Sequence, residues 1–175
     1  MIAIAYGAAD GFHLEYTDKL TQGLIYGNAA HDTSYDEFGY AFGVGDFDHD
    51  GYDDLAVGHP GDKWSGVFLG AVTILMGGIP PLGPSTRHHL IGVGWEGVPG
   101  NHNNWNQNAG YALAVGDFDG TGLPDLAFGV PGYGGNDYPK YDVNLGAEIV
   151  LYSAWKLFSD GLESGATNRW SGAGP

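Results

Sequence analysis

The chain has 175 residues, of which 32 are glycine, 14% are aromatic and only 15% are charged. This composition is typical of a turn-rich β protein and argues against a helical or a disordered chain. The formal net charge of −15 disfavours nucleic acid and anionic membranes as partners, and the absence of cysteine excludes disulfides and thiol redox chemistry.

Two strands are expected at the start of the chain. Residues 2–6 form a short β-branched run, and a polar turn that contains glycine separates them from a second short run at 13–20. The opening residues lack the basic region of a signal peptide, and no apolar run is long enough to cross a membrane. We therefore expect no membrane insertion. If the protein is secreted, we expect its targeting segment to lie outside this sequence.

The central feature is a stretch that occurs twice, at residues 38–61 and 109–132. Each copy has an apolar run (40–45; 111–116), a tight acidic loop, and a second apolar run (55–58; 126–129). Third runs follow at 71–76 and 147–152, and fourth runs at 87–91 and 166–170. Residues 153–160 could add a helical turn. Both copies are thus predicted to form four short strands with an acidic loop between the first two.

In the first acidic loop, oxygen-bearing side chains stand at alternate positions around a turn that Gly51 permits. Six to eight hard oxygen ligands are what a calcium ion requires, and the ion offsets the repulsion between crowded carboxylates. A helix-flanked calcium loop is excluded because its twelfth position needs Glu, and Val57 stands there. The predicted ligands are the carboxylates of Asp46, Asp48, Asp50 and Asp54 and the carbonyl of Tyr52.

The second acidic loop repeats this spacing with one fewer carboxylate, because Thr121 stands where the first loop has Asp50. Its predicted ligands are Asp117, Asp119, Thr121, Asp125 and the carbonyl of Leu123, and its affinity should be the lower of the two. Whether calcium or magnesium occupies it stays open. The alternative for both loops is an ordinary Asp-Gly turn with solvated charges.

These residues resemble a known repeat. The motifs GDFDHDGYDD and GDFDGTGLPD, each with a Gly-x-Pro-Gly segment after the second strand, are similar to the FG-GAP repeat of integrin α-subunits and many secreted bacterial proteins. Ala109 replaces the Phe of the motif, and His59 and Val130 replace an Ala. The resemblance implies an all-β fold of four-stranded antiparallel β-propeller blades, with calcium in the loop between the first two strands of a blade.

Aligned on this repeat, the chain is expected to contain about two and a half blades. Residues 1–37 form a half blade with a loop, 38–108 the first full repeat, and 109–175 the second. A propeller closes into a ring to remove its edge strands, so neighbouring blades from a longer chain or from other copies are needed.

Long connections are expected on the rim opposite the acidic loops, at residues 24–37, 61–69, 93–108 and 132–145. Aromatic and amide side chains on a rigid scaffold suit a protein or glycan ligand, although propellers also use aromatics for packing. The predicted ligand contacts are Trp64, Trp95, His102, Trp105, Tyr133 and Tyr138.

No catalytic motif is found, so no enzyme activity is expected. The leading prediction is a calcium-binding module for adhesion or recognition outside the cell or at its surface. The alternatives are a carbohydrate-binding domain accessory to a secreted polysaccharide-active enzyme, and a purely structural scaffold.

Overall fold

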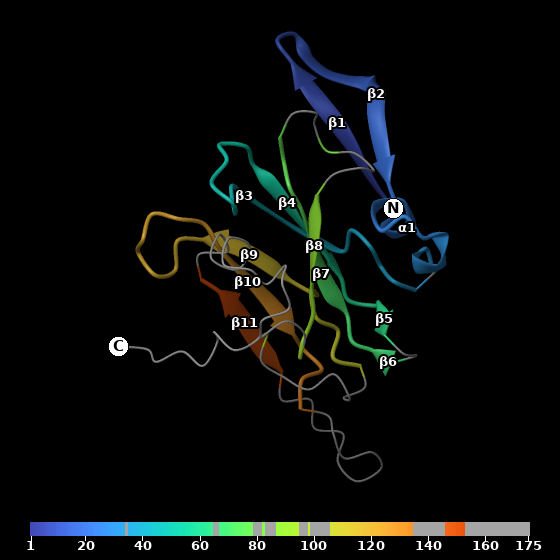
Figure 1. Cartoon of the computed structure of the whole chain (residues 1–175), viewed down its shortest axis with the longest axis vertical. Helices are drawn as coiled ribbons and strands as arrows, with labels where there is room; N and C mark the ends of the chain where they lie inside the picture. The colour runs from blue at the N-terminus through green and yellow to red at the C-terminus, as the bar shows by residue number, and fades with distance from the viewer. Residues whose placement is uncertain are drawn as a thin grey trace.

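The computed structural model describes residues 1–33, 35–64, 67–78, 82, 87–94, 98, 106–134 and 146–152. The described residues form mainly antiparallel β-sheets, joined by two short helical turns (Figure 1). The prediction of an all-β fold is confirmed. No helix in this part of the chain is long and apolar enough to cross a bilayer.

The N-terminal element is a two-stranded hairpin of β1 (Ile2–Ala8) and β2 (Gly11–Leu20). A single helical turn, α1 (Gln22–Ile25), follows, and its N-cap Thr21 accepts a hydrogen bond from the Leu24 amide at 3.2 Å. A 3₁₀ turn, η1 (Ala29–His31), comes next. The connection predicted over 24–37 therefore contains local helical structure that its sequence did not indicate.

The first sheet has four antiparallel strands in the order β3 (Ala41–Gly45), β4 (Asp54–His59), β7 (Ala71–Leu75) and β8 (His88–Ile91). The two strands β5 (Lys63–Trp64) and β6 (Val67–Phe68) form a small side hairpin in the connection between β4 and β7. This up-and-down order is the blade that the repeat pattern predicts.

The second sheet contains β9 (Leu113–Gly116), β10 (Asp125–Val130) and β11 (Ala147–Leu151), with β10 in the middle. The fourth strand predicted at 166–170 and the helical turn at 153–160 lie outside the described residues. The division of the chain at residues 37 and 108 stays a prediction.

The main core lies between the two sheets, which stand side by side in Figure 1. It contains Ile74 from the first sheet and Leu126 and Phe128 from the second, all almost fully buried. Close approach of the sheets depends on glycine, because a Cβ on Gly58 would lie 2.1 Å from the Gly110 carbonyl oxygen. A second cluster packs the base of the β1–β2 hairpin on the other face of the first sheet, through Ile2, Leu20, Val57 and Leu75.

The order of the strands places both acidic loops at one end of the sheets. Each joins the first two strands of its sheet, and Pro124 of the second loop comes within 3.1 Å of a Cβ built on Gly45, where the first loop begins. The chain leaves β4, β8 and β10 at the opposite end, where the long connections were expected.

Candidate metal centre

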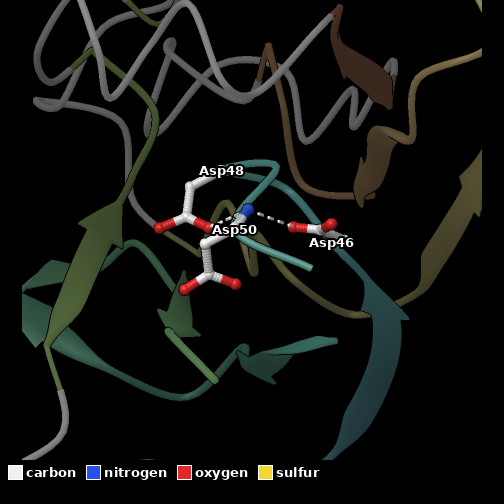
Figure 2. Close-up of side chains that lie close together, drawn as sticks. All are labelled: Asp46, Asp48 and Asp50. Atoms are coloured by element: carbon white, nitrogen blue, oxygen red, sulfur yellow. Dashed lines mark hydrogen bonds between the residues drawn. The ribbon is translucent and has the colours of Figure 1, made fainter. Parts of the chain in front are cut away.

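The first acidic loop is folded by its own carboxylates. The Asp50 amide donates hydrogen bonds to Asp46 Oδ1 at 3.1 Å and to Asp48 Oδ1 at 3.3 Å, as Figure 2 shows. The Gly51 amide donates to Asp46 Oδ2 at 3.1 Å, with Gly51 at a φ of 89°. The loop therefore curls around Asp46 in a conformation that suits glycine.

This curl gathers three carboxylates into one cluster. One oxygen from each of Asp46, Asp48 and Asp50 lies within 4.8 Å of the other two. A carboxylate oxygen that accepts one backbone hydrogen bond retains a further lone pair. The donor set consists entirely of hard oxygens, so these residues fit a calcium ion.

Asp54 occupies the ninth position but has a different environment from the other three. It is 1% exposed, and its two oxygens accept hydrogen bonds from the Phe47 amide at 2.7 Å and the Gly77 amide at 2.8 Å. Burial raises the pKa of Asp54, against the opposing effect of these two amides, and the charges of Asp48 and Asp46 raise it further. Asp54 thus ties the loop to the connection between β7 and β8.

One positively charged side chain lies beside the cluster. The exposed guanidinium of Arg87 forms an ion pair with Asp48, which links the acidic loop to the residue just before β8. Arg87 supplies one positive charge beside three carboxylates, so this pair leaves most of the negative charge of the cluster unmatched.

The second acidic loop gathers Asp117, Asp119 and Asp125 within 4.8 Å. The Gly122 amide donates to Asp117 Oδ2 at 2.8 Å, and the Phe118 amide donates to Asp125 Oδ2 at 2.8 Å. The Thr121 hydroxyl donates to Asp119 Oδ1 at 2.6 Å, so its hydrogen is directed at a neighbouring ligand. Its oxygen still has lone pairs for an ion, but this loop offers one carboxylate fewer than the first.

The described residues include only two of the six predicted ligand contacts, Trp64 and Tyr133. Tyr133 is half-buried and packs against the main core, and Trp64 is the last residue of β5. Trp95, His102, Trp105 and Tyr138 lie outside the described residues. The ligand surface therefore stays a prediction.

A buried polar network was missed by the sequence analysis. His59 is fully buried, with Nε2 at 2.9 Å from Thr73 Oγ1 and Nδ1 at 3.2 Å from Asp62 Oδ2. Tyr26 also contacts Thr73, and Gln22 donates to Asp62 at 2.9 Å. The only sequence signal was a histidine in place of a small residue in the Gly-x-Pro-Gly segment. The network links α1 to the first sheet.

Comparison with known proteins agrees with this geometry. Residues 38–75, which run from before β3 through β7, match the FG-GAP repeat, so this segment is an FG-GAP repeat and the first sheet is a propeller-type blade. The chain is also similar to phosphatidylinositol-glycan-specific phospholipase D from Homo sapiens (36% identical over 106 residues) and from Bos taurus (35% over 104 residues). Each match covers 57% of this chain and only 12% of the relative.

Proposed function

We propose that this chain is a calcium-stabilised, non-catalytic FG-GAP module that serves recognition outside the cell. The observation that carries the proposal is the convergence of Asp46, Asp48 and Asp50 on one point, in a loop whose amides hold the carboxylates in place. A calcium ion there takes its ligands from a loop that is already folded, so little ordering entropy opposes binding.

The ion would fasten the loop to the sheet below it. Asp54 holds the loop to Gly77 from beneath, and the carboxylates above it repel one another without a cation. At ~1 mM calcium and a dissociation constant of ~0.1 mM, one site adds about 1.4 kcal/mol to the free energy of unfolding. A site of this assumed affinity would be empty at cytosolic calcium concentrations, so the proposed role lies outside the cell.

Calorimetric titration of the chain with calcium tests the metal claim. We expect heat of binding from the wild type and at least about tenfold weaker binding at the first site of Asp46→Asn, which loses one charged ligand. Asp53→Asn is the matched control. Asp53 is exposed in the same loop and is not a predicted ligand, so this substitution removes the same charge without removing a ligand. Equal affinity of the two variants would show that the cluster does not hold the ion.

A second candidate function is favoured by the similarity to a phospholipase D whose name makes it specific for phosphatidylinositol-glycan. In this account the chain is an accessory module of an enzyme, and its aromatic rim binds a glycan rather than an adhesion protein. Binding on a glycan array that is lost with Trp105→Ala supports this function. An empty array together with capture of a defined protein partner supports adhesion.

A further inference from the structure

Two tyrosines from the two repeats lie against each other. Tyr40 and Tyr111 hold the same position of the repeat, just before the first strand of each sheet, β3 and β9. Their ring centroids are 4.8 Å apart, with 43° between the ring planes. This separation is near the short end of the range of about 4.5–7 Å in which aromatic pairs lie. Both residues belong to this chain, and each is 48% exposed.

The backbone on both sides of this contact is held by hydrogen bonds. The Tyr40 amide donates to the Gly58 carbonyl at 3.1 Å, and the amide of Gly110, the residue before Tyr111, donates to the Gly129 carbonyl at 3.1 Å. The Gly110 carbonyl oxygen in turn lies where a Cβ on Gly58 would be only 2.1 Å away. The two tyrosines are thus attached to a point of close approach between the sheets, which keeps their rings beside each other.

The hydroxyl ends of the two rings meet. A hydrogen bond with Tyr111 raises the pKa of Tyr40, with further contributions from desolvation and from the charges of Tyr111 and Glu37. The hydroxyl is the only hydrogen-bonding group of a tyrosine side chain, and the two ortho carbons, Cε1 and Cε2, flank the ring carbon that bears it. A hydrogen bond between the two hydroxyls therefore brings an ortho carbon of one ring beside an ortho carbon of the other.

We propose that Tyr40 and Tyr111 form a site of oxidative cross-linking, at which hydrogen peroxide and a peroxidase join the two rings as dityrosine. Each phenol loses one electron and one proton, and the two radicals form a carbon–carbon bond between ortho carbons. The hydrogen on each of these carbons then moves as a proton to the phenol oxygen of the same ring, which restores both aromatic rings. One molecule of hydrogen peroxide takes up the two electrons and two protons and becomes two molecules of water.

The structure favours this reaction over coupling between separate molecules. The two hydroxyls are adjacent in the product, as they already are in the folded chain, so little reorganisation is needed. The chain has no cysteine whose thiol would be oxidised first. Because β3 begins at Ala41 and the first acidic loop follows Gly45, the cross-link would join the sheets at the end opposite the acidic loops. It requires no metal ion and goes beyond the proposed function.

Treatment of the dilute chain with hydrogen peroxide and a peroxidase tests the proposal. We expect a monomeric product that has lost two hydrogen atoms, shows dityrosine fluorescence, and after trypsin digestion joins the peptides 20–63 and 88–140, which contain Tyr40 and Tyr111. Tyr40→Phe and Tyr111→Phe should each lower its yield at least about tenfold, because the contact supplies the proximity. Tyr35→Phe is the matched control and should react as wild type, since Tyr35 lies in the same tryptic peptide as Tyr40 and is 67% exposed.

Thermal unfolding gives a second readout. A cross-link between residues so far apart in the sequence restricts the unfolded chain as a disulfide does, so treatment should raise the Tm of the wild type by at least about 5 °C and leave that of Tyr40→Phe unchanged. Melts before treatment confirm that each variant is folded. Equal yields from wild type and Tyr40→Phe, cross-linked multimers alone, or an unmodified chain in a mixture where free tyrosine couples would overturn the proposal. Calcium binding is measured separately, so the proposed function can hold or fail independently.

Discussion

Asp54 and Asp48 belong to the same predicted ligand set but have different surroundings. The two oxygens of Asp54 accept backbone hydrogen bonds from opposite sides, from Phe47 and Gly77, at a site that is almost fully buried. Asp48, in contrast, is bonded within its own loop and to an exposed arginine. The two aspartates should therefore respond differently to the same substitution.

We predict that Asp54→Asn lowers the free energy of unfolding by about 1–3 kcal/mol even in EDTA, because the new amide group turns a donor toward a backbone N–H. Asp48→Asn, measured beside it, should change stability in EDTA by less than about 0.5 kcal/mol. Urea unfolding of both variants provides the measurement. If Asp54→Asn matches the wild type without metal, its buried hydrogen bonds do not stabilise the loop.

The environment of Asp62 predicts that its contribution to the free energy of unfolding depends on pH. Burial alone would raise its pKa, but the hydrogen bond and charge of His59, with donors from Gln22 and the Lys63 amide, bring the pKa below the ordinary value of 3.8. A carboxyl group with a lowered folded-state pKa contributes stability above its unfolded pKa and loses it as pH falls through the folded pKa.

The stability difference between wild type and Asp62→Asn should therefore be constant from pH 7 to about 5, at about 1–3 kcal/mol, and shrink below about pH 4. Denaturant unfolding at a series of pH values measures it. A difference that grows on acidification would contradict the assignment.

The alternating carboxylates of the first loop could be predicted from sequence, because ligand spacing is local. The partners of the loop could not. Gly77 lies 23 residues beyond Asp54, and Arg87 lies 39 residues beyond Asp48. The pairing of β7 with β4, and of β8 with β7, brings these residues together. The histidine network was missed for the same reason, since Thr73 and Tyr26 reach His59 from different elements.

Among the elements, the described strands of the two sheets were predicted well because each is a short apolar run closed by glycine or by an acidic turn. The small strands β5 and β6 were missed, since they lie in the segment 61–69 that was predicted as a connection. The predicted run at 71–76 differs from β7 by one residue, and the run at 55–58 lies within β4. The helical turn α1 was missed because one turn gives no periodicity to detect. Which face of each sheet meets its neighbour also required the structure.

Equivalent glycines of the two repeats provide a matched test of sheet packing. A Cβ on Gly58 would meet the Gly110 carbonyl oxygen at 2.1 Å, whereas one on Gly129 would meet the Ala112 Cβ at 3.8 Å. We expect Gly58→Ala to lower the free energy of unfolding by about 1–3 kcal/mol through the forced separation of the sheets. Gly129→Ala should be near neutral or slightly stabilising. Equal effects in thermal unfolding would argue against close packing at Gly58.

The whole molecule combines a propeller-type blade, a second sheet of the same repeat pattern and an N-terminal hairpin, with both acidic loops at one end of the sheets. The chain corresponds to only 12% of the relatives it matches, so its blades do not by themselves account for such a protein. Metal binding at the end of the sheets that carries the acidic loops would stabilise both blades together.

Thermal unfolding of the full chain in EDTA and in about 1 mM calcium tests this account most directly. One occupied site should raise Tm by about 3–6 °C, with a smaller effect of magnesium, and the rise should disappear in the double variant Asp46→Asn, Asp117→Asn. An identical Tm in EDTA and in saturating calcium would contradict the claim that the acidic loops bind calcium and hold the sheets together.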